Sequence, residues 1–420
     1  MLIATPQHHD PAIKKLYNIL LGFSLLNLFI VAISGLALRG YFFFPLPLEF
    51  KNLLHGHSHF AFGGWVMPVL FSLVLRYFPS LANRYSIKHW RRLSFMFLLS
   101  AYGMLVSFPA GGYSFISIVF STVSLVAIFY LALLVWKAGI GKYAAEKFLI
   151  WGLIYGVLSS LGPFLTGPLI VMGYKGSPEY YNAIYFFLHF QYNGLFVFLA
   201  LAVFFQIFMK KKRKGAAGIF FRLMNLAVVP SFALSLLWNK PHLVWNVIGF
   251  SGALIQLIAI LFFIRILREN NIHSRFNPIW KFVFVAFCVK LFLQLISAFP
   301  LVASLAVSQR NFIIAYLHLV LLGIISFSVF AILQNVLKKE ITGRWGVRIF
   351  FTGFIITELF LVAQATGSAF MWALPFFNEL IFIFSCLLPV GSLLMFYSVS
   401  VRKIFSYRSS KTRLRPAFIE

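Results

Sequence analysis

Three histidines recur along the chain at nearly constant spacing, and each is followed five residues later by a glycine. They are His59, His189 and His318, so the two intervals are 130 and 129 residues. A nearly fixed period is typical of repeat architectures. All three stand in long apolar segments, where a histidine is energetically expensive and by default marks a functional site. Because neutral imidazole is a common metal ligand, the pattern predicts metal-binding side chains in three equivalent places.

A plainer alternative is that each of these histidines only forms a hydrogen bond to a neighbouring helix, as polar side chains in membrane bundles do. Their equal period and equal depth favour a ligand role. The accompanying glycines allow close helix packing, and they would also leave room for a flat macrocycle beside the helix.

The segment around the first histidine contains the most chemistry, because His55, His57 and His59 alternate with small residues. On a helix His55 and His59 share one face, and His57 points roughly the other way. One histidine can therefore bind a ligand while another meets a different partner. Alternating histidines also occur in metal-transporter loops, and a transporter with a His-rich metal site is therefore a competing interpretation.

The elements that must position these histidines are membrane spans. Hydrophobic residues make up 61% of the 420 residues and charged residues only 11%, whereas soluble domains carry about 25% charged residues. This composition excludes a water-soluble fold and intrinsic disorder. Both cysteines, Cys288 and Cys386, lie in apolar segments, so neither a disulfide framework nor a cysteine metal site is expected.

Twelve apolar segments reach the length of about 20 residues that crosses a bilayer. We expect them to be helices, because backbone groups in lipid must be hydrogen-bonded within the segment. The predicted spans are 16–38, 53–77, 92–112, 115–137, 147–171, 181–208, 218–238, 242–265, 280–304, 311–336, 346–370 and 378–400.

The predicted fold is an all-α polytopic membrane protein, with one integral membrane domain over residues 1–420. Three four-helix repeats, at about 13–140, 141–270 and 271–400, would surround a pseudo-threefold axis. A basic cytoplasmic tail would follow at 401–420.

The basic residues alternate with the spans. Of the 36 Lys and Arg, 30 fall in the N-terminal segment, the tail and every second loop. The positive-inside rule therefore places both termini in the cytoplasm, and we expect the inner (plasma) membrane of a bacterium. The same rule accounts for the basic run at 210–214 and for the tail at 402–415, without a need for anionic-lipid binding. No nucleic-acid partner is expected.

Two charged residues lie in the middle of predicted spans, Lys290 in the ninth and Glu358 in the eleventh. Each costs several kcal/mol there unless it is paired or solvated. A functional interpretation is a proton path or a partner for heme propionates, and the alternative is an ion pair or a snorkelling side chain. We predict a contact between Lys290 and Glu358 across the helices.

The twelve spans, cytoplasmic termini and threefold histidine pattern resemble the heme-copper oxidase subunit I superfamily, which includes cytochrome oxidases and nitric oxide reductases. In topology the resemblance covers nearly the whole chain. In residues it covers three helices: the His-rich second span as far as Trp65-Val-Met-Pro68, the sixth with His189 and the tenth with His318.

The resemblance implies a b-type heme held by His318 and one histidine of the second span. The internal repeat favours His59, whereas the family spacing to the downstream Met-Pro pair favours His57, and of the two we prefer His59. With two axial imidazoles the iron has no open position, so this heme would carry electrons rather than bind gas.

The sequence also departs from the family pattern. Tyr316 stands where the family has the histidine of its catalytic heme, and the family's histidine pair after the seventh span is reduced to a lone His242. Asn193 stands where oxidases commonly have a tyrosine, and Tyr192 is one position earlier. Oxygen reduction at a standard binuclear centre is therefore not expected, and the chain is oxidoreductase-like without an assigned reaction.

A divergent second site remains an expectation. His189, His242 and one of His55 or His57 could bind copper or non-heme iron. The expected partners are the lipid bilayer, an electron donor of the respiratory chain such as cytochrome c or quinol, a small gas ligand, and partner membrane subunits. A cofactor-free assembly or scaffold protein is a further alternative beside the transporter.

Overall fold

The computed structural model describes residues 10–209, 215–239, 241–337, 341–372 and 375–412. Within them every regular element is a helix, and twelve helices are long and apolar enough to cross a membrane. They are Pro11–Gly40, Phe50–Tyr77, Ile87–Gly111, Phe115–Lys137, Ala144–Val171, Pro178–Phe208, Ala216–Asn239, Val244–Glu269, Pro278–Ile296, Arg310–Gln334, Ile341–Ala369 and Phe377–Val399. The predicted all-α polytopic membrane fold is confirmed.

Several spans consist of more than one helical element. The first four spans are α1 (Pro11–Gly40), α2 (Phe50–Phe60) with η1 (Ala61–Val66) and α3 (Met67–Tyr77), α5 (Ile87–Gly111), and α6 (Phe115–Lys137). The next four are α7 (Ala144–Ser159) with α8 (Leu161–Val171), α9 (Pro178–His189) with η2 (Phe190–Phe196) and α10 (Val197–Phe208), α11 (Ala216–Ser231) with η3 (Phe232–Asn239), and α12 (Val244–Glu269). The last four are α13 (Pro278–Ile296), α15 (Arg310–His318) with η5 (Leu319–Ser326) and α16 (Phe327–Leu337), α17 (Ile341–Ala369), and α18 (Phe377–Ser385) with α19 (Leu387–Thr412). Short connecting helices are α4 (Pro79–Ala82), η4 (His273–Arg275) and α14 (Pro300–Ser308).

One predicted boundary is wrong. The ninth span ends at Ile296 and not at 304, because Pro300 starts the separate helix α14. Proline is favoured in the first turn of a helix, but it interrupts a helix that is already running.

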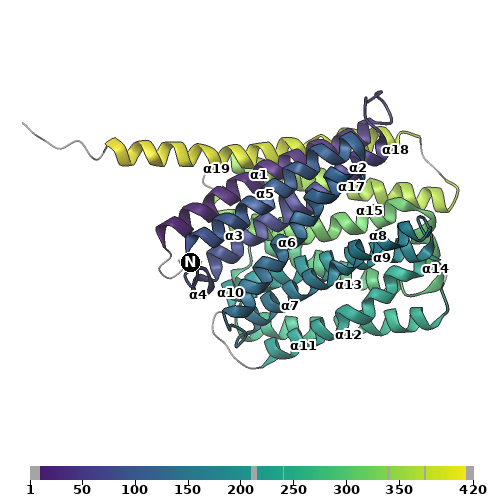
Figure 1. The fold of residues 1–420 in the computed structure, drawn as a ribbon, viewed down its shortest axis with the longest axis horizontal. Coiled ribbons are helices and arrows are strands. Elements are labelled where there is room, and N and C mark those ends of the chain that lie inside the picture. The colour runs from purple at the N-terminus through teal and green to yellow at the C-terminus, as the bar shows by residue number, and fades with distance from the viewer. Residues whose placement is uncertain (1–9, 210–214, 240, 338–340, 373–374, 413–420) are drawn as a thin grey trace, which may run out of the picture.

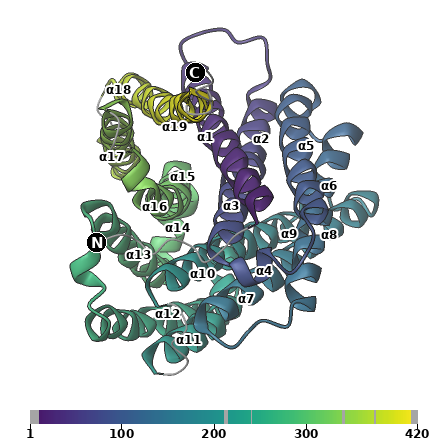
Figure 2. The same cartoon turned by 90° about the vertical axis from the view of Figure 1, so that its left-hand side faces the viewer.

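The spans form one bundle with the histidine-bearing spans in the middle. Seen along the bundle axis, α3, α10 and α16 surround the centre, and α5, α6, α7, α11, α12, α17 and α19 lie outside them (Figures 1 and 2). The second and sixth spans are correspondingly the most buried, since 78% of the most apolar window of each lies inside the protein. These central helices position the candidate site.

Each of the three repeated histidines stands just before a π-helical segment. His59 precedes η1 by two residues, and His189 and His318 directly precede η2 and η5. The three segments begin at 61, 190 and 319, which gives two intervals of 129 residues. Short π-helical turns are rare in proteins, and those that occur are often found at functional sites. This regularity supports the three-repeat hypothesis, which stays a prediction.

Side chains join these π-helical segments to each other and to the outer ring. Trp65 Nε1 of η1 donates to Ser326 Oγ of η5 at 2.8 Å, and Ser326 Oγ donates to the carbonyl of Leu321 at 2.8 Å. Asn27 Nδ2 of α1 donates to the carbonyl of Gly64 at 2.7 Å. The carbonyls that a π-turn displaces from the helical ladder thus find side-chain donors.

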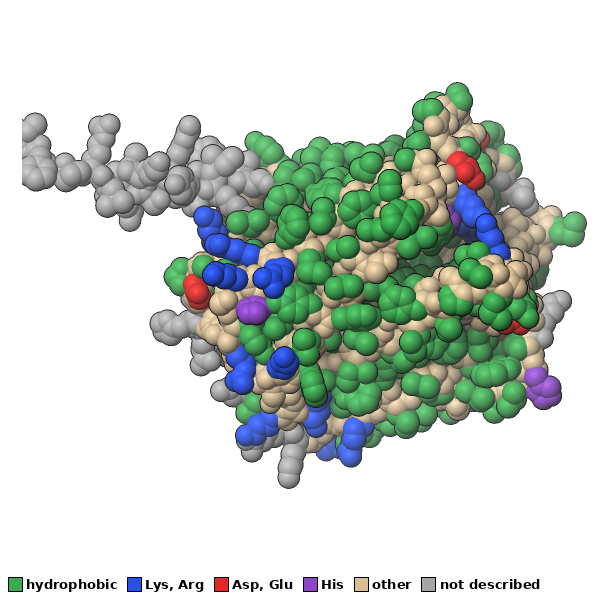
Figure 3. Space-filling model, viewed as in Figure 1, with side chains coloured by type: hydrophobic (Ala, Val, Ile, Leu, Met, Phe, Trp, Pro, Cys, Tyr) green, Lys and Arg blue, Asp and Glu red, His purple; other side chains and the backbone are tan. Residues whose placement is uncertain are grey.

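Charge separates the two ends of the bundle. Lys and Arg side chains gather at one end, at the left in Figure 3, and apolar side chains cover the middle. We call this the basic end; α3 ends there, with Arg76 in its last turn, and α5 begins there, with Arg92 near its start. The other is the opposite end, where α2, α9 and α15 begin. The basic run at 210–214 and the tail beyond 412 lie outside the described residues.

The two halves of the central spans differ in packing. From the π-helical segments toward the basic end almost every side chain is buried, whereas most side chains of α2, α9 and α15 are partly exposed. The histidines therefore lie at the boundary between a closely packed half and a more open half.

Candidate cofactor site

His57 lies on the face of α2 that is turned toward α1. Its Nδ1 is 3.0 Å from Ser34 Oγ. A Cβ atom on Gly35 would lie 3.0 Å from Cε1 of the imidazole, so glycine at this position leaves room for the ring. The first span thus orients His57 through Ser34 and through the backbone carbonyl of Val31, which is also within hydrogen-bonding range of the ring. Among the described residues, no bond of good geometry to Nε2 is found.

His318, at the end of α15, is held in the same way by a charged partner. Its Nδ1 is 2.8 Å from Glu358 Oε1 of α17. The two side chains keep 30% and 15% of their surface exposed although both lie within spans. Glu358 Oε2 is buried without a partner, so the site holds an acceptor that protein atoms leave unused.

His57 and His318 belong to one electrostatic group. Their imidazoles are close enough for their charges to interact, and Arg39 of α1 is within range of both His57 and Glu358. Two imidazoles, a carboxylate and a guanidinium from four spans therefore meet in the open half of the bundle.

His59 faces a different region, and our preference for it as the partner of His318 is corrected. Its ring stacks on Phe108 of α5 with centroids 4.2 Å apart, and Nε2 is 3.0 Å from the hydroxyl oxygen of Tyr113. His55 lies on the same side, with its ring 4.7 Å from that of Tyr113. A separation of two residues turns a side chain to nearly the opposite helix face. The histidine that shares a site with His318 is His57.

His189 of the sixth span has both ring nitrogens engaged. Its Nε2 donates to the carbonyl of Val228 at 2.9 Å, and its Nδ1 accepts from Asn193 Nδ2 at 3.2 Å. His242 is exposed beyond η3, where its Nδ1 accepts from the backbone N–H of Val244 at 3.3 Å. In the described parts of the chain no three His, Cys, Asp or Glu side chains are grouped to hold a metal ion. The proposed set of His189, His242 and His55 or His57 is thus not assembled.

The predicted contact between Lys290 and Glu358 is wrong. Lys290 Nζ of α13 is 3.5 Å from Gln256 Oε1 of α12, whereas Glu358 is bonded to His318. Lys290 and Glu358 belong to two spans of the same predicted repeat, 271–400, but each faces a neighbour of its own, so the Glu358 carboxylate belongs to the histidine site.

Three residues of the site were missed from the sequence: Ser34, Gly35 and Arg39 of the first span. A Ser-Gly pair in an apolar span gives little signal, because small residues also serve helix packing. Arg39 did give one, as one of the few basic residues outside the basic loops. Glu358 was noticed, but its partner was not.

No family model matches the sequence, and a search of curated proteins finds no significant match.

Proposed function

We propose that the protein is a heme-binding membrane redox protein in which His57 and His318 hold a b-type heme. The observation that carries this proposal is that both imidazoles are fixed through Nδ1, by Ser34 and Glu358, while both Nε2 atoms are free. Metal-bound histidines typically donate their other ring N–H to a carboxylate, carbonyl or hydroxyl, which fixes the tautomer and orients the ring.

The surroundings fit such a group. His57 and His318 keep part of their surface exposed inside the open half of the bundle, and η1 and η5 pack against each other just below them. Glycine at position 35 keeps α1 clear of the His57 ring.

Each side chain has a definable role toward the heme. Glu358 accepts from His318 Nδ1–H, which keeps Nε2 unprotonated and raises its basicity as a ligand. Ser34 orients His57 through the corresponding nitrogen, and Arg39 supplies a positive charge that balances carboxylates. When bound, a heme with two axial imidazoles supplies one-electron transfer without an open iron position.

A second metal does not fit the described residues. His189 has no free nitrogen, and His242 and His55 lie elsewhere. We therefore assign electron transfer, and no gas reduction, to this chain. Membership in the heme-copper oxidase subunit I superfamily, a bacterial inner-membrane location with cytoplasmic termini, and a donor such as cytochrome c or quinol are parts of the same proposal.

The test is an optical spectrum of detergent-purified protein from heme-replete expression, oxidised and dithionite-reduced, with iron and copper analysis on the same sample. We expect about one iron per chain, a sharp reduced α band and no change on addition of carbon monoxide. A folded, colourless and metal-free protein would refute the proposal and leave transport or scaffolding. A carbon monoxide shift would refute the two-histidine ligation.

A further inference from the structure

A second polar cluster lies between the sixth and ninth spans, away from the proposed heme site. Lys290 Nζ is 3.5 Å from Gln256 Oε1, and Gln256 Nε2 donates to Ser231 Oγ at 3.2 Å. Ser231 Oγ and His189 Nε2 both donate to the carbonyl oxygen of Val228, at 3.0 and 2.9 Å. One continuous series of polar contacts thus joins four spans in the middle of the bundle.

Every member of this cluster is buried. Lys290 is 1% exposed, Gln256 2% and His189 1%. No carboxylate pairs with Lys290 in the described chain, and His189 is the ionisable group within range of its charge. An ammonium group has three donors, and Gln256 takes one of them at long distance. A cation buried in this way requires further solvation.

The cluster also holds unused acceptors. Gln294 Oε1, one helical turn from Lys290, is buried without a hydrogen-bond partner in the described chain. The Tyr316 hydroxyl lies beside the Asn193 side chain, but no bond of good geometry joins the two. Each unsatisfied group costs about 1–3 kcal/mol, and buried waters usually bond such groups. Water beside Lys290 and Gln294 would bond both of these groups.

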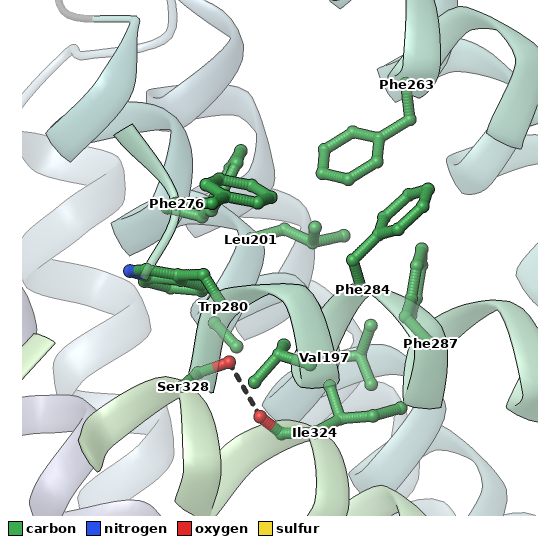
Figure 4. Close-up of a pocket in the computed structure, with 12 residues that line it drawn as sticks. Val197, Leu201, Phe263, Phe276, Trp280, Phe284, Phe287, Ile324 and Ser328 are labelled. Carbon is green, nitrogen blue, oxygen red and sulfur yellow. Dashed lines mark hydrogen bonds between the residues drawn. The ribbon is translucent and has the colours of Figure 1, made fainter. Parts of the chain in front are cut away.

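Toward the basic end the cluster is closed by an apolar pocket. Figure 4 shows aromatic side chains of this pocket from α12, from α13 and from the segment just before α13. The ring-bearing residues are Phe204, Phe263, Phe276, Trp280, Phe284 and Phe287. The hydroxyl of Ser328 is bonded to the carbonyl of Ile324 at 2.6 Å. Its lining is otherwise apolar, so it offers water few hydrogen-bond partners.

Toward the opposite end polar groups continue. Tyr192 and Tyr316 face each other with ring centroids 6.1 Å apart. Tyr185, one to two turns further along α9, is within electrostatic range of Tyr192 and of Arg310, which begins α15. Tyr192 is buried in η2, whereas Tyr185, Tyr316 and Arg310 belong to α9 and α15, whose side chains are mostly partly exposed.

We propose that this cluster is a hydrated chamber that opens to the opposite end, and that Lys290 exchanges its proton with water on that side. On release the Lys290 ammonium gives one proton to chamber water and becomes a neutral amine; on uptake the reverse occurs, and no oxidant or reductant takes part. The aromatic pocket keeps the chamber separate from the basic end. This inference is independent of heme binding.

The experiment measures which side reaches the chamber. In a parent with Cys288→Ala and Cys386→Ala, we would introduce Asn193→Cys, Gln294→Cys or Val197→Cys singly. Val197 is the matched control, because it lies one turn beyond Asn193 but lines the apolar pocket. Silver ions, which enter narrow water-filled spaces, are added to right-side-out or inverted vesicles, and free thiols are then counted with maleimide after denaturation.

With silver added on the opposite-end side, we expect the thiols of Asn193→Cys and Gln294→Cys to become blocked to maleimide at least tenfold faster than the thiol of Val197→Cys. Exposed markers, Met172→Cys at the opposite end and Ser274→Cys at the basic end, report vesicle orientation. Equal rates for Asn193→Cys and Val197→Cys, or faster protection from the basic end, would overturn the chamber. If either Asn193→Cys or Gln294→Cys fails to elute as a monodisperse species, the other of these two variants is compared with Val197→Cys.

The proton itself is followed by nitrogen NMR of lysine labelled at Nζ, in vesicles with a different pH on each side. The Lys290 signal is identified by its loss in Lys290→Met. We expect its nitrogen chemical shift to move between the values of an ammonium and an amine as the pH on the opposite-end side changes. A signal that does not respond, or that follows the basic-end side, would refute the assignment of Lys290.

Discussion

Two histidine regions at the same depth of one bundle have opposite character. At the site of His57 and His318, one nitrogen of each ring is bonded and the other is free. At His189 both nitrogens are bonded, to Val228 and Asn193, and the ring is fully enclosed. The same residue type is therefore available to a ligand in one place and used for structure and hydrogen bonding in the other.

The difference shows that the unused nitrogen identifies a candidate metal ligand, and the presence of histidine alone does not. Partners at Nδ1 prepare His57 and His318 for a metal, because they fix the tautomer that exposes Nε2. His189 would have to break two hydrogen bonds before it could bind one. Substitutions in the two regions should consequently give different phenotypes.

The largest effect is expected from His318→Ala. This change removes one of two axial ligands, so we expect heme content to fall at least tenfold, measured as pyridine hemochrome per purified protein. His189→Ala is the matched control and should keep its heme. Equal loss of heme in both variants would remove the contrast between the regions.

A smaller effect is expected from Glu358→Gln. The amide keeps the size of the side chain but loses its charge, and loss of such a supporting group costs about 10–100-fold in metal affinity. Heme titration of the apoprotein measures this affinity. Lys290→Met removes the other mid-span charge and should leave heme affinity within about twofold. A larger loss of heme affinity in Lys290→Met than in Glu358→Gln would contradict our assignment of Glu358.

Gly35→Val tests whether α1 must make room for the His57 ring. The new side chain begins 3.0 Å from His57 Cε1, a separation that is too short unless the ring moves, so we expect heme affinity to fall about tenfold, the loss expected when a ligand is displaced. Gly167→Val is the control, because nothing lies within 4 Å of a Cβ at that position. The two share the cost of a β-branched residue in a helix, and equal heme affinities would disprove the steric role.

His189→Ala should change stability more than cofactor content. It removes two buried hydrogen bonds and leaves a cavity, which together cost about 2–4 kcal/mol. A lower temperature of thermal aggregation in detergent, at unchanged heme content, is the expected result. Loss of heme without loss of stability would instead indicate that His189 is a ligand.

The sequence predicted the twelve spans and the histidine period because both depend on local composition and spacing. It did not decide between His57 and His59, since helical periodicity gives their relative directions and not the identity of the neighbour on each side. The contact between His318 and Glu358 joins residues 40 positions apart, and it depends on how two spans pack. The π-helical segments were also missed, because they interrupt the 3.6-residue period used to find helix faces.

The most direct test of the central claim is the reduced-minus-oxidised optical spectrum of His57→Ala beside that of His59→Ala, with the unchanged protein as reference. We expect a heme α band in the unchanged protein and in His59→Ala, and its loss in His57→Ala. A band that survives in His57→Ala and disappears in His59→Ala would contradict the assignment of His57.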